Sequence, residues 1–343
     1  MKYDAILLVS FGGPEKNEDV LPFLENVLWG RNVPRERMLA VAEHYYHFGG
    51  KSPINDQNRE LIISLQGELR ASGIDLPVYW GNRNWHPLLG DTMRRMKQDG
   101  IQRTLAFVTA SYSSYSSCRQ YRENIATARE AAGEGAPEVH KIRAYFNHPR
   151  FIDTMVDRLR VALEQLPKEL RSEARVVYTA HSIPQAMAEA CPYVKQLTEA
   201  SRLVSSRLGR SGDPLVFQSR SGPPTQPWLE PDILDHLRSI HSKGSRAVVI
   251  VPIGFVSDHM EVLYDLDTEA RSLCEALGME MVRAGTAGTH PWFVSMIREL
   301  VEERMRDSHH RPALGELGPA HDVCPVDCCP APMRMVTVSR ASG

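Results

Sequence analysis

Short apolar runs rich in β-branched residues alternate along this chain with longer segments in which apolar and polar positions repeat at helical spacing. The runs predict strands at residues 5–9, 78–81, 104–109, 141–145, 175–179, 215–218, 247–251 and 280–283. The intervals include amphipathic stretches such as residues 58–70 and 291–306. Strands that alternate with helices predict parallel sheets covered by helices on both faces. Since the strands fall into two groups of four, we expect an α/β protein built of two similar halves.

The length and composition of the chain fit two globular domains. It has 343 residues, of which 42% are hydrophobic and 24% are charged, and a domain usually needs ~150 residues. We expect an N-terminal domain at residues 1–148, a C-terminal domain at 149–312 and a cysteine-containing tail at 313–343. The formal net charge of -2, without a run of basic residues, gives no sign of nucleic-acid binding. A small-molecule partner is therefore expected.

Two further features bear on the cellular setting. The N-terminus runs directly into the first strand, and no apolar run reaches the ~18 residues that span a bilayer. We therefore expect a cytoplasmic protein without a transmembrane segment. The six cysteines are too few for a disulfide scaffold at this length, so their placement favours a metal or redox role.

The residues that follow each strand are where chemistry is expected, because ligands of parallel α/β sheets bind beyond the carboxyl ends of the strands. The first strand is followed by Phe11-Gly-Gly-Pro14, which lacks the G-x-G-x-x-G spacing of a dinucleotide site. The third is followed by the hydroxyl-rich segment 110–121, whose side chains can bind carboxylates or cap the next helix. The fifth is followed by His181, which can accept a proton near neutral pH or bind a metal. A lone histidine is more often a helix cap or a hydrogen-bonded core residue.

The seventh strand leads into an acidic segment at residues 254–269. If a helix begins near residue 260, the carboxylates of Glu261, Asp265 and Glu269 recur at i, i+4 and i+8 on one face, with Asp258 and His259 at their mouth. Stacked like charges destabilise an isolated helix, so this acidic stripe favours a metal path or a proton relay. The alternative is a solvated acidic helix face, which is common. Together with His181, the stripe predicts a site that removes protons and delivers a metal.

Five segments of the chain, in this order, resemble those of ferrochelatases. They are Leu7-Leu-Val-Ser-Phe-Gly-Gly-Pro14, Gly49-Gly-Lys-Ser-Pro53, Thr179-Ala-His-Ser-Ile-Pro184, Gln226-Pro-Trp-Leu-Glu-Pro-Asp232 and Val251-Pro-Ile-Gly-Phe-Val-Ser-Asp-His-Met-Glu-Val-Leu-Tyr-Asp265. The resemblance extends to about residue 306. It implies a lyase of haem biosynthesis that inserts Fe(II) into a porphyrin. It also implies two Rossmann-like domains, each a four-stranded parallel sheet flanked by helices, with the active site in the cleft between them.

The resemblance assigns roles to individual residues. His181 matches the family's histidine, which acts as a base or delivers the metal, and Glu261 matches the glutamate that faces it across the porphyrin. Asp265 and Glu269 extend this line outwards as metal ligands or proton carriers. Two positions depart from some relatives: Phe11 stands in place of an iron-binding tyrosine, and Asn84 stands about where an outer metal site has a histidine.

The substrate is expected to be held by side chains around the cleft. The candidate porphyrin contacts are Phe11, Ser52, Asn55, Gln57, Tyr112, Arg119 and Tyr121. Protoporphyrin IX carries two propionates and coproporphyrin III carries four, and the loop and tail cysteines resemble those of coproporphyrin III enzymes, so we favour coproporphyrin III. The expected partners are the porphyrin, ferrous iron and, in transient contacts, neighbouring enzymes of the haem pathway. Two alternatives stay open: a cobalt or nickel chelatase acting on a sirohydrochlorin, and a bilobed protein that carries haem without catalysis.

The tail carries a second inorganic signal, because three thiols fall within six residues of a proline-rich segment. Such a segment cannot form a packed core by itself, and a metal would hold it in place. Some ferrochelatases bind a 2Fe–2S cluster through three cysteines near the C-terminus and one in the loop after the third strand, so the resemblance implies a cluster here. Its ligands would be Cys118, Cys324, Cys328 and Cys329.

Two alternatives apply to the tail. Zinc could be bound by His321 together with the three tail cysteines, or the thiols could be unligated. The remaining cysteines, Cys191 and Cys274, lie in helix-like contexts and are expected to serve packing.

Overall fold

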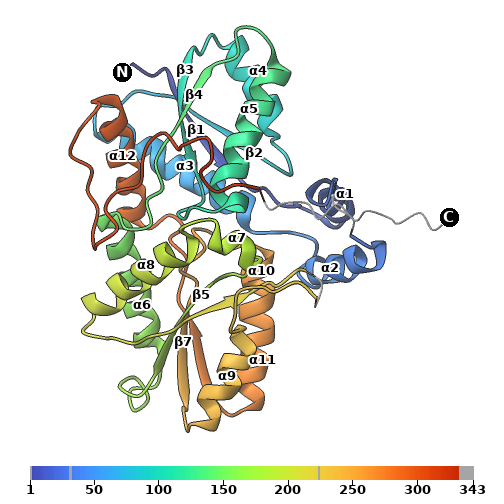
Figure 1. The fold of residues 1–343 in the computed structure, drawn as a ribbon, viewed down its shortest axis with the longest axis vertical. Helices are drawn as coiled ribbons and strands as arrows, with labels where there is room; N and C mark the ends of the chain where they lie inside the picture. The colour runs from blue at the N-terminus through green and yellow to red at the C-terminus, as the bar shows by residue number, and fades with distance from the viewer. Residues whose placement is uncertain (1, 31–32, 223–224, 332–343) are drawn as a thin grey trace, which may run out of the picture.

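Two four-stranded parallel sheets organise the chain (Figure 1). The computed structural model describes residues 2–30, 33–222 and 225–331. The first sheet contains β1 (Ala5–Ser10), β2 (Val78–Asn82), β3 (Arg103–Val108) and β4 (Glu138–Lys141), in the spatial order β2-β1-β3-β4. The second contains β5 (Arg175–His181), β6 (Leu215–Gln218), β7 (Ala247–Val251) and β8 (Glu280–Arg283), in the order β6-β5-β7-β8. All neighbouring strands run parallel, so the predicted α/β class with two similar halves is confirmed.

Helices occupy the connections between the strands. The first half contains α1 (Asn17–Val27), α2 (Arg35–His47), α3 (Ile54–Ala71), α4 (Leu89–Gln98), the π-helix η1 (Tyr115–Arg119) and α5 (Gln120–Ala132). The rest of the chain contains α6 (Pro149–Gln165), α7 (Gln185–Glu189), α8 (Tyr193–Arg207), α9 (Ile233–Ser242), α10 (Met260–Val262), the π-helix η2 (Leu263–Ala270), α11 (Arg271–Ala276) and α12 (Pro291–Met305).

Each sheet is buried on both faces, as a near-continuous apolar strand sequence requires. Leu7 and Val9 of β1 point into a core shared with α4 and α5, whereas Ile6 and Leu8 point into a larger core on the opposite face. That larger core continues through α6 and α12 to one face of the second sheet, and α9, η2 and α11 cover the other. In Figure 1, α12 lies beside α3 of the first half. Because this core and α12 contact both halves, the domain boundaries at residues 148 and 312 stay a prediction.

Two predicted elements differ from the structure. The fourth strand is expected at residues 141–145 but lies at Glu138–Lys141. The residues after it, including Ile142 and Tyr145, are apolar and buried without being part of a strand, which explains the misplacement. The helix that begins at Met260 is not a regular α-helix, because its middle section, η2, forms i→i+5 hydrogen bonds: the Arg271 N–H donates to the Leu266 carbonyl.

The chain after α12 runs back across the middle of the molecule (Figure 1), and its Glu316 N–H donates to Glu199 Oε1 on α8 at 2.8 Å. Arg143, paired with Glu303 in a fully buried ion pair, donates to the Pro312 carbonyl at 3.0 Å. The Asn147 amide donates to the Leu314 carbonyl at 3.0 Å and to the Gly318 carbonyl at 2.8 Å. These bonds fix the tail as far as the cysteines. Within the described ranges, no helix combines the length and apolar character needed to cross a membrane.

Candidate functional site

His181 is the last residue of β5 and projects from the carboxyl edge of the second sheet. The loop after β7 passes directly over this strand end at Gly254, whose N–H donates to the Thr179 carbonyl at 3.0 Å. A Cβ at position 254 would lie 2.6 Å from the Ala180 Cβ, which is closer than van der Waals contact allows. Glycine is therefore required for the loop to bring the acidic segment against His181.

His181 and Glu261 form the centre of the site. The His181 Nε2 atom lies 3.5 Å from Glu261 Oε1. The His181 Nδ1–H donates to the Ser182 carbonyl, which leaves Nε2 as the nitrogen that can exchange a proton or bind a metal. Burial disfavours the charged imidazole, but the Glu261 carboxylate outweighs it and raises the pKa of His181 to about 9. Partial desolvation beside His181 would raise the pKa of Glu261, whose side chain is still 47% exposed, but the imidazole outweighs it and holds this pKa well below its usual range.

The carboxylates of the acidic stripe lie on one continuous helical segment, with Glu261 on α10 and Asp265 and Glu269 on the π-helix η2. Glu261 and Glu269 are exposed, and Asp265 is half-buried between them. His259 caps the helix, since its Nδ1 accepts a hydrogen bond from the Glu261 N–H at 3.2 Å. π-Helical segments are rare and occur frequently at functional sites. The predicted neighbours thus share one surface with His181, although their spacing along the helix axis is not that of an α-helix.

Asp265 is held by two residues that follow β6. The Ser219 hydroxyl donates to Asp265 Oδ2, and the Gln218 Nε2 lies 3.4 Å from the same oxygen. Ser219 has a φ of 62°, a left-handed conformation that turns its hydroxyl towards the stripe. Burial raises the pKa of Asp265 to about 7, with a further contribution from the Glu261 charge and an opposing one from Ser219. Asp265 can therefore exchange protons near neutral pH.

Residues of the first half contact this segment directly. The Asp258 N–H donates to Gln57 Oε1 on α3 at 2.8 Å, and the Asp258 carboxylate accepts from Arg283 at 3.1 Å. On the other side, the His44 ring of α2 stacks on Tyr264 of η2, with centroids 3.6 Å apart. The acidic stripe is thus fixed between α2 and α3, at the junction of the two halves.

The predicted porphyrin contacts fall into different environments. Ser52, Tyr112 and Tyr121 are buried, and the Tyr112 hydroxyl donates to the Ile253 carbonyl at 3.0 Å across the junction. Asn55 is also buried and donates to Glu15 Oε1 at 2.8 Å. Arg119 donates to the carbonyls of the tail, which directs it away from a role at the junction. Their proposed contact with substrate stays a prediction.

Phe11 is the candidate contact with an open aromatic face. Its side chain follows β1, is 37% exposed and packs edge-on against Phe23. The Arg83 guanidinium lies 5.7 Å from the Phe11 ring centroid and 4.5 Å from that of Tyr121. The Asn84 side chain donates to the Phe11 carbonyl at 3.2 Å, so it stabilises the turn after β1.

A second cluster, the thiol pocket, lies where the tail meets η1. The pocket is lined by Cys118, Arg119, Arg122, Cys324, Cys328 and Cys329. The Cys118 and Cys324 thiols are near enough to shift each other's pKa, and the Cys328 and Cys329 sulfurs lie 3.6 Å apart. The donor atoms of His321, Cys324 and Cys328 all lie within 4.8 Å of one another. The loop cysteine and the tail cysteines predicted to act together are therefore brought together.

Positive charges surround these thiols. The Arg119 guanidinium donates to the Cys328 carbonyl at 3.1 Å, and the Arg122 guanidinium donates to the Cys324 carbonyl at 3.3 Å. The hydrogen bond from Cys324, with contributions from Lys141 and Arg122, lowers the pKa of Cys118 despite its burial. The thiolate, which is the form that binds metals, is thus favoured at Cys118, whereas the interaction with Cys118 raises the pKa of Cys324 and burial raises that of Cys329.

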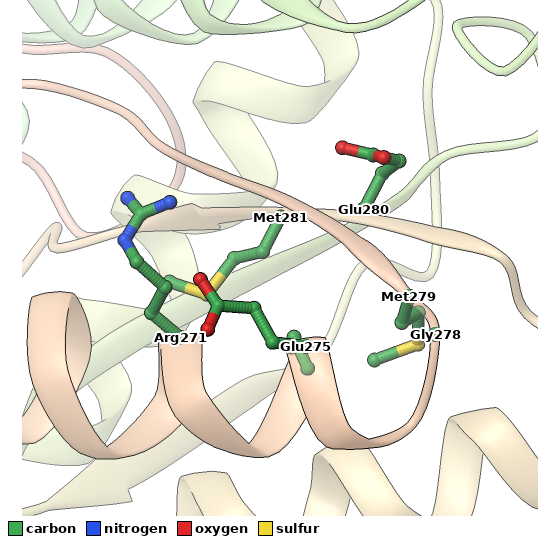
Figure 2. A pocket seen from close by; sticks show the side chains of 7 residues that line it. Arg271, Glu275, Gly278, Met279, Glu280 and Met281 are labelled. Atoms are coloured by element: carbon green, nitrogen blue, oxygen red, sulfur yellow. The ribbon is translucent and has the colours of Figure 1, made fainter.

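Another hollow, of about 310 Å³, lies at the outer edge of the second sheet between α11 and β8 (Figure 2). Figure 2 shows Arg271 and Glu275 projecting from α11 beside Met281 of β8. Its lining contains none of the residues of the acidic stripe or the thiol pocket.

Sequence reasoning missed several residues of the site. Gln218 and Ser219 follow β6, so the rule that ligands bind at carboxyl ends of strands could have found them. Arg283, which pairs with both Asp258 and Asp267, ends β8 and is open to the same reasoning. His44 on α2 carries no sequence signal, because only tertiary packing places it over Tyr264.

The fold and the site together define an α/β protein with two four-stranded parallel sheets and a histidine–carboxylate pair at the carboxyl edge of the second sheet. The fold is similar to that of the sirohydrochlorin chelatase SirB from Bacillus subtilis subspecies spizizenii in complex with cobalt, with a TM-score of 0.51 and 11% identity over 89% of this chain and 97% of that chain. It is also similar to SirB from Bacillus subtilis with Fe3+, with a TM-score of 0.51 and 14% identity over 89% of this chain and 98% of that chain. At these identities the likeness shows the fold alone.

Sequence comparison is more specific. The profile of the ferrochelatase family matches residues 3–305. The chain is 60% identical to a ferrochelatase of Rhodopirellula baltica, over 95% of this chain and 93% of that protein. It is 50% identical to the coproporphyrin III ferrochelatase of Streptomyces coelicolor, over 96% of this chain and 94% of that protein. The chain therefore belongs to the ferrochelatase family, whose activity is the insertion of Fe(II) into a porphyrin in haem biosynthesis.

Proposed function

We propose that this enzyme inserts Fe(II) into coproporphyrin III, with His181 and Glu261 as its catalytic pair. The observation that carries the residue assignment is the 3.5 Å approach of His181 Nε2 to Glu261 Oε1 at the head of the acidic stripe. Support for the substrate comes from relatives at 48–50% identity, among them those of Streptomyces coelicolor and Frankia alni, which are coproporphyrin III ferrochelatases.

Metallation replaces two pyrrole N–H protons by one Fe(II), so two protons must leave as the metal enters. His181 has its Nδ1–H bound to the Ser182 carbonyl, and Nε2 is the atom that accepts a proton. In the resting site the imidazole is charged at neutral pH, because Glu261 raises its pKa to about 9. A ferrous ion near Glu261 offsets that carboxylate and lowers the imidazole pKa, so metal arrival frees the base.

Protons then pass along the stripe. Asp265 lies next to Glu261 and has a pKa of about 7, so it can both take up and release a proton at physiological pH. Glu269, the outermost carboxylate, is exposed and receives iron from solvent or returns protons to it. Residues near His181 thus carry out the acid–base chemistry, and Glu269 exchanges iron or protons with solvent.

The thiol pocket fits an iron–sulfur cluster. Four sulfurs line one pocket, and Arg119 and Arg122 supply positive charge that compensates an anionic cluster. Cys118, Cys324 and Cys328 would be its ligands, with Cys329 or His321 as the fourth. When bound, such a cluster would supply a redox-active cross-link between the tail cysteines and Cys118 of η1. The cytoplasmic location and transient contacts with neighbouring haem-pathway enzymes stay predictions.

Anaerobic metallation assays test the proposed function. The protein is mixed with Fe(II) and either coproporphyrin III or protoporphyrin IX, and the shift of the Soret band is followed. We expect turnover of both porphyrins, with a higher kcat/KM for coproporphyrin III. A higher kcat/KM for protoporphyrin IX would refute the substrate assignment, and turnover of neither would refute the activity.

A further inference from the structure

The segment that carries Glu261 and Asp265 is bound at both of its ends by one arginine. Arg283 is the last residue of β8, and its side chain is 14% exposed. Its guanidinium forms a fork with Asp267 of η2, in which Nε donates to Oδ1 at 2.7 Å and Nη2 donates to Oδ2 at 2.8 Å. The remaining nitrogen, Nη1, donates to Asp258 Oδ1 at 3.1 Å, ahead of α10. One planar, rigid group therefore sets the separation of the two ends of the segment.

Asp258 is itself held from two other sides. Its carboxylate also accepts a hydrogen bond from the Thr286 hydroxyl at 3.2 Å. Its N–H donates to Gln57 Oε1 on α3 at 2.8 Å, and the Gln57 Nε2 atom lies 3.4 Å from Asp258 Oδ2. The next residue, His259, caps the helix by accepting a hydrogen bond from the Glu261 N–H at 3.2 Å. The position of Asp258 therefore determines where this helix begins, and with it the position of Glu261.

The other end of the segment is a π-helix. π-Helices are rare and occur mostly as single turns, whereas η2 extends over Leu263–Ala270. Contacts from other elements must therefore stabilise it. Two parallel hydrogen bonds fix the orientation of a carboxylate as well as its distance, so the fork from Arg283 to Asp267 holds this turn of η2 in one rotation about the helix axis. In that rotation Asp265, two residues earlier, accepts the hydrogen bond of the Ser219 hydroxyl.

We infer that Arg283 is a positioning residue for metallation, which holds α10 and η2 in the register that places Glu261 beside His181. The inference rests on the proposed function, in which these two residues are the catalytic pair. Arg283 acts through its two carboxylate partners, Asp258 and Asp267, and takes no part in the chemistry itself.

The kinetic test compares Arg283→Met with Arg298→Met in the full-length protein. Arg298 is the matched control, because its side chain is 18% exposed and pairs with three glutamates of α3 and α12. For Arg283→Met we expect kcat to fall by at least about tenfold, since small displacements of a reacting group have effects of this size or larger. The KM for the porphyrin should stay within about twofold, and Arg298→Met should keep both constants within about twofold. Asp267→Asn breaks the same fork and should also lower kcat, which tests the inference if Arg283→Met does not fold.

The pH profile of kcat/KM separates positioning from a loss of folded enzyme. A smaller folded fraction lowers the rate equally at every pH. Removal of a nearby cation would by itself raise the pKa of the His181 imidazole and move the rise of the profile to higher pH. Displacement of Glu261 takes a carboxylate away from the imidazole, so in Arg283→Met the rise should instead move to lower pH. An unchanged profile, or one shifted to higher pH, would overturn the inference.

Crystal structures of the wild type and of Arg283→Met test the inference without turnover. In the variant we expect the separation of His181 Nε2 and Glu261 Oε1 to exceed 3.5 Å, and Asp265 to lose its contact with Ser219. Unchanged positions of these side chains would contradict it. The proposed function is judged separately, because an inactive wild type or a fully active Glu261→Gln enzyme would refute that function and leave the crystallographic test of Arg283 in force.

Discussion

The two halves of the molecule have the same strand topology but carry different chemistry at equivalent positions. The orders β2-β1-β3-β4 and β6-β5-β7-β8 are related by a shift of four strands. In each half the loop after the third strand in sequence leads to a π-helix, to η1 directly after β3 and to η2 through the short α10 after β7. η1 carries Cys118 and faces the tail, whereas η2 carries Asp265 and Glu269 and faces His181.

The strands that precede them differ in the same way. β1 leads into Phe11, an exposed ring that offers an apolar surface, and β5 ends at His181, an acid–base group. The shared topology brings both to the junction, because the carboxyl ends of parallel strands lie at one edge of a sheet. One half thus carries an exposed ring and a thiol that contacts the tail, and the other carries the histidine and the carboxylates proposed to handle protons and metal. The repeated fold positions residues, and their identity decides the function.

The largest effect is expected from substituting, in separate variants, the residue at each of the two strand ends. We expect His181→Ala to abolish metallation while porphyrin affinity stays within about tenfold, because the imidazole acts on protons or metal and not on the bulk of the ring. Phe11→Leu is the matched variant and should weaken porphyrin binding with little change in kcat. Soret-band kinetics measure the first and fluorescence quenching the second. A His181→Ala enzyme with half the wild-type rate would contradict the assignment.

The thiol side of the comparison is tested by Cys118→Ser. We expect the wild type to be brown, with iron and acid-labile sulfide near two per chain for a 2Fe–2S cluster, and the variant to be colourless. Cys274→Ala is the control, since Cys274 is a buried residue of α11 and does not line the thiol pocket. Stoichiometric zinc without visible absorption in the wild type would show that the pocket is a zinc site.

Glu261→Gln sharpens the comparison on the acid–base side. We expect kcat to fall by at least ~10²-fold, the usual scale for loss of a positioned acid/base group. In the wild type, kcat/KM should rise with pH as His181 loses its proton near its pKa of about 9. Without the Glu261 carboxylate, burial lowers the pKa of the imidazole, so this rise should move to lower pH. The pH profiles of both proteins measure the shift, and an unchanged profile would rule out the ion pair.

The sequence predicted the sheets and the strand ends well, because these depend on local patterns. Apolar runs located seven of the eight strands within a few residues. The rule about carboxyl ends led to His181 and Glu261, which the structure brings within 3.5 Å of each other and whose roles stay a prediction. β4 was misplaced because the buried residues after it, such as Ile142, have the same composition as a strand without being one.

Features that depend on tertiary contacts could not be predicted in the same way. The i, i+4 spacing of the stripe suggests an α-helix, and nothing in that spacing distinguishes a π-helix. The pKa of Asp265 is raised to about 7 mainly because the tertiary structure buries its carboxyl, against the opposing hydrogen bond from Ser219 of another segment. Likewise, the carbonyls that bind Arg119 are more than two hundred residues away in sequence, so its role in holding the tail is visible only in the structure.

The smallest effect is expected at the outer end of the stripe, where the functional and the surface interpretations differ most. Glu269 is exposed, and an exposed carboxylate about 4 Å from a cation contributes roughly 1 kcal/mol per unit charge in water, which is about fivefold in affinity. We therefore expect Glu269→Gln to raise the KM for Fe(II) about fivefold with kcat nearly unchanged, and the effect to shrink at high salt. Glu275→Gln, an exposed carboxylate on α11 beside the outer hollow, is the matched control and should change neither constant. Steady-state assays at varied Fe(II) measure both. Equal, small effects at Glu261, Glu269 and Glu275 would show that the stripe is only a solvated helix face, since a relay requires the residue nearest His181 to matter most.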